Sequence, residues 1–156
     1  MVKTKDTIKS GDIINLQGTF NDTEFIIDKD NLSITSIGKT ASLFDCTVYL
    51  QGQNNIKNSS ISNLTINNTK NACEGIIIDS ATGIHVSDNT VYVSGSNGFA
   101  LTTYSMKNSV IENNYLESFH TQTTLRIYGS DNNNFTNNTV KGYRKMHRTG
   151  SMHICR

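Results

Sequence analysis

The sequence repeats one short pattern four times at a nearly constant interval. In each copy an apolar residue precedes a turn rich in Asn, and apolar residues then alternate with polar ones. The copies are Ile61–Ile66, Val86–Val91, Ile111–Leu116 and Phe135–Val140. Their last residues fall at positions 66, 91, 116 and 140, so the interval is constant to within one position. A constant interval in the range of roughly 20–50 residues predicts a protein built from stacked coils.

Each repeat has room for three short strands. The first strand is an apolar-x-apolar segment, as in Val48–Leu50, Ile76–Ile78, Phe99–Leu101 and Leu125–Ile127. The second strand ends just before the Asn-rich turn, and the third follows it. Because apolar and polar residues alternate, each strand turns one apolar row inward. Successive coils then form three parallel sheets around a narrow core, with neighbouring strands about 4.8 Å apart.

This arrangement predicts which side chains stack inside the coils. We expect one internal row to contain Ile66, Val91, Leu116 and Val140. A second row is expected to contain the apolar residues of the first strands, which are Ile78, Leu101 and Ile127.

The pattern is less regular before residue 45. The segment Asn31–Ile34 matches Asn63–Ile66, but the distance between them is longer than the interval of the later copies, which predicts a loop insertion in one coil. Gly11–Leu16 and Glu24–Asp28 are expected to form the first two strands of an opening coil.

The pattern stops after Val140, and residues 143–156 are basic and aperiodic. We therefore predict a β-helix domain over residues 1–142 and a separate tail over 143–156. We expect the tail to leave the last coil open, so that the chain is part of a longer repeat protein or associates end to end with itself.

Composition excludes several classes of partner. The chain has 20 Asn, 19 Thr and 16 Ser but no Pro, which suits turns and outward strand positions. A net charge of +1 creates no field that attracts nucleic acid. No apolar run approaches the roughly 20 residues of a membrane span, and residues 1–15 lack a signal-peptide core.

The four His residues show no metal-ligand spacing, so we expect neither a metal nor another cofactor.

Residues 8–142 resemble the right-handed parallel β-helix of the pectate-lyase-like superfamily. Within it, Ser10–Leu16 and Lys29–Ile34 are similar to the opening coil of NosD-like and adhesin-like repeat proteins of microbial surfaces. The resemblance implies an all-β, single-stranded β-helix of about five coils, located outside the cell or on its surface. It implies little about activity, because this architecture carries lyases, hydrolases, epimerases and plain scaffolds.

Leu64, Asn89, Asn114 and Asn138 occupy the same turn position in consecutive coils. Similar β-helices place a ladder of Asn side chains there. Asn tolerates the left-handed backbone of a tight turn, and its amide both donates and accepts hydrogen bonds. Each amide can therefore satisfy buried polar groups that would otherwise cost about 1–3 kcal/mol each.

The outward positions of the first strands are where similar polysaccharide lyases bind substrate. Our candidate ligand-binding residues there are Tyr49, Asp79, Arg126 and Tyr128. The whole face is expected to consist of Tyr49, Gln51, Ile77, Asp79, Ala100, Thr102, Arg126 and Tyr128. A calcium-dependent lyase needs several carboxylates and a base, and a hydrolase needs a close pair of acids. Since Asp79 is the one acid on this face, we predict no catalytic residue.

Two cysteines precede first strands of adjacent coils. Rung spacing brings Cys46 and Cys73 within the Cα separation of a disulfide, about 4.4–6.8 Å. Both can instead be buried, unpaired residues. The redox state of Cys155 is equally open.

The sequence favours a non-catalytic, adhesin-like protein that binds a polysaccharide, a cell-surface glycan or another surface partner. The alternatives are a fragment of a polysaccharide lyase or hydrolase whose active coils lie elsewhere, and a structural spacer.

Overall fold

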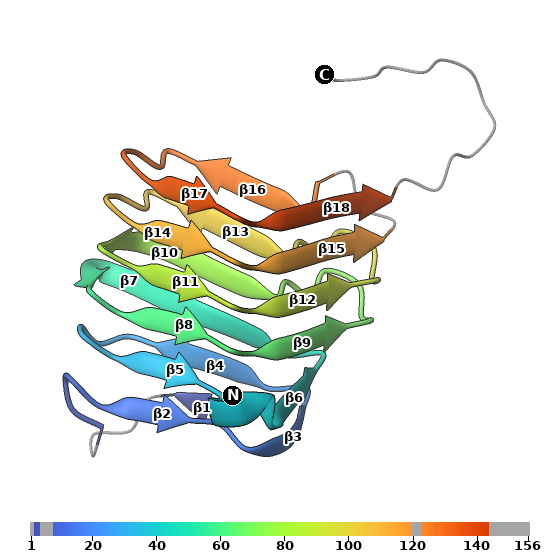
Figure 1. Ribbon diagram of the computed structural model, residues 1–156, viewed down its shortest axis with the longest axis horizontal. Helices are drawn as coiled ribbons and strands as arrows, with labels where there is room; N and C mark the ends of the chain where they lie inside the picture. Colours follow the sequence, from blue (N-terminus) through green and yellow to red (C-terminus); the bar gives the residue numbers. More distant parts are fainter. Residues whose placement is uncertain (1, 4–7, 120–122, 144–156) are drawn as a thin grey trace.

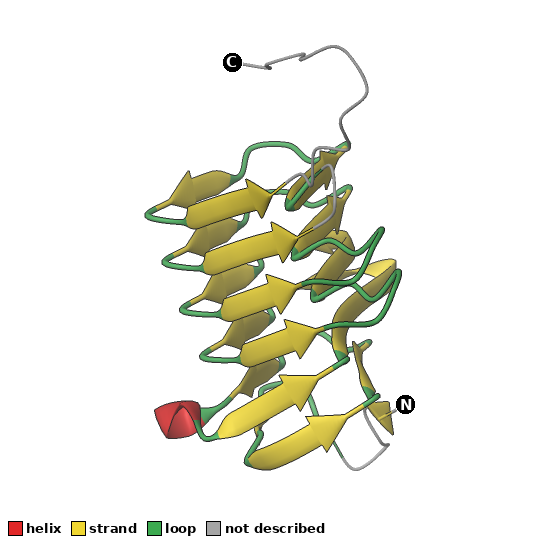
Figure 2. Ribbon diagram, turned by 90° about the vertical axis from the view of Figure 1, so that its right-hand side faces the viewer, coloured by secondary structure: helices red, strands yellow, loops and turns green. Residues whose placement is uncertain are grey.

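The computed structural model describes residues 2–3, 8–119 and 123–143 and has the predicted architecture. It is an all-β solenoid of about five coils with three parallel sheets (Figure 1). The coils lie directly above one another, so each sheet follows one side of the stack (Figure 2). The one helical element in the described chain is a short 3-10 turn, η1 (Ile37–Lys39), at the edge of the stack.

Each sheet has six strands, and each takes every third strand of the chain. Sheet A consists of β1 (Val2–Lys3), β4 (Glu24–Ile27), β7 (Thr47–Lys57), β10 (Ile76–Thr82), β13 (Leu101–Tyr104) and β16 (Leu125–Tyr128). Sheet B consists of β2 (Ile13–Asn15), β5 (Ser33–Thr35), β8 (Ser60–Ser62), β11 (His85–Ser87), β14 (Val110–Glu112) and β17 (Asn134–Thr136). Sheet C consists of β3 (Gly18–Asn21), β6 (Ala41–Phe44), β9 (Thr65–Asn68), β12 (Thr90–Val93), β15 (Tyr115–Phe119) and β18 (Thr139–Tyr143).

The first predicted internal row is confirmed. Ile66 pairs with Val91, Val91 with Leu116, and Leu116 with Val140. The first three side chains are buried, whereas Val140 is 46% exposed because it ends the row.

The second predicted row is wrong by two positions in one coil. Leu101 pairs with Ile76 and Leu125, so Thr103 occupies the position between Ile78 and Ile127. A polar residue is tolerated in this inward position because the Thr103 hydroxyl lies 3.1 Å from the Ser130 hydroxyl and hydrogen-bonds to it. The segment Phe99–Leu101 has the apolar alternation of a strand, but β13 begins only at Leu101, and Phe99 and Ala100 belong to the preceding turn.

The opening coil also differs from the prediction. Between β2 and β4 lies β3, which the sequence reading missed, so β4 begins the second coil rather than continuing the first. Ile34 pairs with Ile61 and not with Ile66. The insertion therefore lies in β7, where Gln51 pairs with Asp79 but Ile56 pairs with Ala81.

The predicted domain boundary falls close to the last described strand, since β18 extends to Tyr143. Residues 144–156 lie outside the described residues, and with them most of the predicted tail. No helix in the described part of the chain is long and apolar enough to cross a membrane.

The Asn ladder is present at the turn between sheets B and C. Asn89 Nδ2 donates to Asn114 Oδ1, and Asn114 Nδ2 donates to Asn138 Oδ1, each at 3.0 Å. The same oxygens accept the backbone N–H groups of Asn89 and Asn114. Leu64 begins the ladder by donating its N–H to Asn89 Oδ1 at 3.0 Å.

The left-handed residue of this turn is one position earlier than expected. Positive φ angles occur immediately before each ladder position, at Asn63, Asp88, Asn113 and Asn137. The two requirements of the turn are thus divided between neighbouring residues. The first adopts the left-handed backbone, and the second supplies the hydrogen-bonding side chain.

A second ladder, not foreseen from the sequence, follows the turn between sheets A and B. Ser59 Oγ accepts the Leu32 N–H at 3.1 Å, and Ser109 Oγ accepts the Ile84 N–H at 2.9 Å. Asn133 Oδ1 then accepts the Ser109 N–H at 2.9 Å. Short polar side chains therefore satisfy backbone donors of adjacent coils at both of these corners.

Replacing Leu116 by Ala tests the internal row. The side chain is buried within a narrow core that has little room to relax, so Leu116→Ala should lower the free energy of unfolding by about 2–5 kcal/mol. Val140→Ala, at the exposed end of the same row, should cost much less. Urea denaturation measures both, and equal losses would contradict the stacking.

Replacing Asn114 by Ala tests the ladder. The change removes bonds to Val86 O, Glu112 O and Asn138 Oδ1 and leaves buried groups unpaired. Asn114→Ala should therefore cost at least about 1 kcal/mol of unfolding free energy. The matched control is Asn134→Ala, at an exposed strand position. A ladder without energetic value would give the two variants the same urea midpoint.

Candidate functional site

The candidate residues lie on the outward face of sheet A. Strand pairing places Tyr49 beside Ile77, Ile77 beside Thr102, and Thr102 beside Arg126. In the adjacent outward row, the side chains in order are Gln51, Asp79, Tyr104 and Tyr128. The predicted place of Ala100 on this face is wrong, because Ala100 precedes β13, and strand pairing places Thr102 and Tyr104 in the two outward rows of its coil.

Tyr49 and Asp79 form the first half of the site. The Tyr49 hydroxyl donates to Asp79 Oδ2 at 3.4 Å, and the Ser80 hydroxyl donates to Oδ1 at 2.9 Å. Burial raises the pKa of Tyr49, and the charge of Asp79, its hydrogen bond and the charge of Glu24 raise it further. The phenol therefore stays protonated at neutral pH and acts as a hydrogen-bond donor.

Arg126 organises the second half of the site. Its guanidinium carbon lies 3.4 Å from the centre of the Phe99 ring, and its Nη1 donates to the Tyr104 hydroxyl at 3.2 Å. The rings of Tyr104 and Tyr128 stack at 5.7 Å with an interplanar angle of 8°. Cation–π contact and the hydrogen bond hold the half-buried guanidinium in one orientation.

The two halves form one continuous surface. Asp79 and Tyr104 are paired neighbours in adjacent strands, so they join Tyr49 to the Arg126 cluster. We call the set Tyr49, Asp79, Tyr104, Arg126 and Tyr128 the tyrosine strip. Four of its side chains are half-buried, and Tyr128 is 57% exposed.

Four of the five residues of the strip are the candidates predicted from the sequence, and Tyr104 was not among them. The error follows from the two-position shift around Phe99–Leu101 described above. Counting one repeat interval forward from Asp79 leads to Tyr104, so the constant interval contained the necessary information. The role of Phe99 as a platform under Arg126 has no counterpart in the repeat.

The strip offers several kinds of polar group on an aromatic surface. It combines phenol hydroxyls, one carboxylate and one guanidinium. Glu24, on the second strand of sheet A, is a further carboxylate close enough to influence Tyr49. Within residues 2–3, 8–119 and 123–143, no group of three or more His, Cys, Asp or Glu side chains is arranged to hold a metal ion.

The possible disulfide between Cys46 and Cys73 is absent, and both thiols are free. Cys46 is buried, and its thiol lies 3.2 Å from Phe44 O and 3.5 Å from Phe20 O. Burial raises the pKa of both thiols. Both are therefore protonated at neutral pH and less reactive than an exposed cysteine. Cys155 is outside the described residues.

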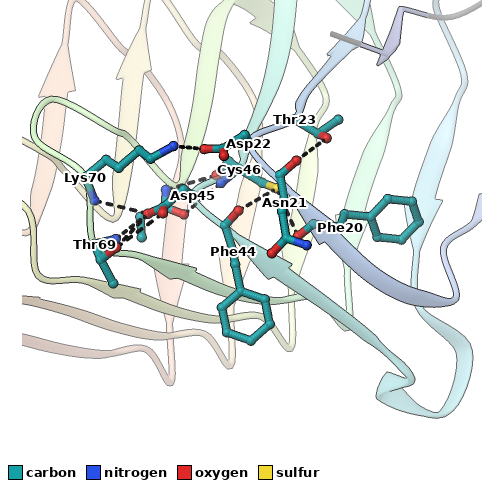
Figure 3. A network of polar contacts seen from close by, with 10 residues as sticks. Phe20, Asn21, Asp22, Thr23, Phe44, Asp45, Cys46, Thr69 and Lys70 are labelled. Atoms are coloured by element: carbon teal, nitrogen blue, oxygen red, sulfur yellow. Dashed lines mark hydrogen bonds and ion pairs between the residues drawn. The ribbon is translucent and has the colours of Figure 1, made fainter.

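A second polar cluster lies at the corner between sheets C and A (Figure 3). Asp45 Oδ1 accepts the N–H groups of Thr69 at 2.5 Å and of Lys70 at 3.1 Å, and the Thr69 hydroxyl donates to the same carboxylate. The Lys70 ammonium in turn pairs with Asp22. These contacts link the loops of three successive coils, and we assign them a structural role.

Comparison with known proteins identifies no relative. No protein-family model, curated protein or solved structure matches the chain.

The Asp45 cluster predicts a loss of stability in acid. Burial alone would raise the pKa of Asp45, but hydrogen bonds from Thr69 and Lys70 outweigh it, so the pKa lies below 3.8. The stabilisation is present above the unfolded-state pKa and is lost as the pH falls through the folded-state value.

Asp45→Asn should therefore reduce the difference in urea midpoint between pH 7 and about pH 3. Asp131→Asn, at an exposed carboxyl, is the matched control and should leave that difference unchanged. If Asp45→Asn retained the full pH dependence of the natural chain, the cluster would have no such role.

Proposed function

We propose that the chain is a non-catalytic, adhesin-like protein of the cell surface or extracellular space that binds glycan through the tyrosine strip. We also propose that it belongs to the pectate-lyase-like superfamily, near the NosD-like and adhesin-like repeat proteins. The observation that carries the binding proposal is the arrangement of Arg126 on Phe99, hydrogen-bonded to Tyr104 and flanked by Tyr128.

The chemistry of the strip suits a sugar chain. Sugar rings have apolar C–H faces and hydroxyl edges, so they need both aromatic surface and polar groups. The protonated Tyr49 and Arg126 can donate to sugar oxygens, and the carboxylate of Asp79 can accept from sugar hydroxyls. Tyrosine combines a rigid apolar ring with a polar tip, which is why it is enriched in binding surfaces.

The dimensions of the strip also favour an extended ligand. From β7 to β16 it crosses four strands, about 14 Å at the usual spacing. The strip follows the stack of coils and lies across the strands. A linear oligosaccharide lying along the coil stack would therefore contact the tyrosines in turn.

The position of the carboxylates favours binding over cleavage. Asp79 is on β10 and Glu24 is on β4, with β7 between them. A calcium-dependent lyase needs several oxygen ligands around one ion, and a hydrolase needs two acids that flank one bond. Glu24 pairs with Thr47, whereas Asp79 pairs with Gln51, four positions further along β7. Four positions correspond to about 13 Å along the strands, so these two carboxylates are too far apart to meet either requirement.

Glycan binding can be tested with substitutions that preserve the fold. A glycan array first selects a ligand for the purified chain, and titration calorimetry then compares variants. Arg126→Ala and Tyr104→Phe should each weaken binding by about tenfold, equivalent to about 1.4 kcal/mol. Tyr92→Ala removes a partly exposed ring from sheet C and should not alter affinity.

Two outcomes would contradict the proposal. The first is equal affinity for the natural chain and both strip variants. The second is cleavage of the glycan with formation of an unsaturated product that Asp79→Ala abolishes, which would favour the enzyme alternative. Far-UV circular dichroism of each variant separates loss of contact from loss of folding.

A further inference from the structure

Among the described residues, the first and the last strand of each sheet have a neighbouring strand on one side only. In the described chain, β16, β17 and β18 are the last strands of sheets A, B and C, and β1, β2 and β3 are the first. The two sets lie at opposite ends of the stack (Figure 1). An edge strand has a row of unpaired N–H and C=O groups that can pair with another chain.

The end formed by β16, β17 and β18 also exposes residues of the internal rows. Ile127 and Val140 are each 46% exposed, and Leu125 and Phe135 are only partly buried. The preceding residues of the same rows are buried, as at Leu101, Ile111 and Leu116. The end surface is thus a cross-section through the apolar core.

The opposite end presents the first residues of the same rows. Ile14 begins the row that continues through Ile34 and Ile61 and ends at Phe135. Phe20 begins the row that continues through Leu43 and ends at Val140. Ile14 and Phe20 are only partly buried and pack against the core from that end.

We propose that the end formed by β16, β17 and β18 binds the opposite end of a second copy of this chain. Continuing each sheet places Ile14 of the second copy over Phe135 and Phe20 of the second copy over Val140. The contact covers the core at both ends and supplies each edge strand with a parallel partner. It does not depend on glycan binding, because the tyrosine strip faces outward from sheet A.

The geometry makes this contact head-to-tail. One end of each copy meets the other end of the next, so no closed pair forms and assembly continues along the axis. A net charge of +1 provides little electrostatic repulsion between copies. We therefore expect oligomers whose mean size rises with concentration.

Sedimentation velocity of the full chain over a wide concentration range tests the proposal. Ile127→Lys with Val140→Lys places two charges on one end, at positions that are already exposed. This double variant should be monomeric. The matched control Phe44→Lys replaces a 40% exposed ring on sheet C and should assemble like the natural chain.

Mixing experiments distinguish the head-to-tail contact from other modes. Ile14→Lys blocks the opposite end, so this variant should also be monomeric alone. Mixed with the double variant, it should form dimers and nothing larger, because one free end of each kind remains. If Ile14→Lys fails to fold, the double variant added to the natural chain should still shorten its oligomers.

The proposal is overturned by any of three results. In the first, the natural chain stays monomeric at all concentrations. In the second, the double variant forms the same oligomers as the natural chain. In the third, Phe44→Lys abolishes the oligomers and the double variant does not.

Discussion

The parallel hydrogen bonding between successive coils determines everything else in this protein. Each strand pairs in register with the strand one repeat away, so a residue on the outside of one coil lies beside its equivalent in the next. This register aligns the apolar rows inside and the polar ladders at the corners. It also brings Asp79 beside Tyr104 and Tyr104 beside Tyr128. A surface site in such a fold is built from residues one repeat apart in the sequence, with few local contacts.

The sequence predicted the fold because the repeat is visible where the core is apolar. Ile66, Val91 and Leu116 show it clearly, and so does the Asn ladder. The prediction failed at Thr103, an inward polar residue whose hydroxyl hydrogen-bonds to Ser130. It also failed in β7, which contains extra residues after Gln51. Neither this hydrogen bond nor the irregular pairing leaves a pattern in the alternation of apolar residues.

The tyrosine strip was predictable to the extent that it follows the register. Tyr49, Asp79, Arg126 and Tyr128 were found from outward strand positions, and a strict count of the repeat would have added Tyr104. The contact between Arg126 and Phe99 was not predictable. Phe99 lies in the turn before β13, and the conformation of that turn places its ring against the guanidinium. The strip and the end of the solenoid are separate surfaces, so the proposed glycan contact and the proposed contact between copies would not compete.

Glycan binding on the outward face of sheet A, as proposed here, should be detectable residue by residue in solution. Amide chemical shifts measured by NMR during titration with the selected glycan test it most directly. Binding through the tyrosine strip should concentrate the shift changes in β7, β10, β13 and β16, around Asp79, Tyr104 and Arg126, and leave sheets B and C unchanged. Shifts concentrated on sheet B or sheet C, or no shifts with any glycan, would contradict it.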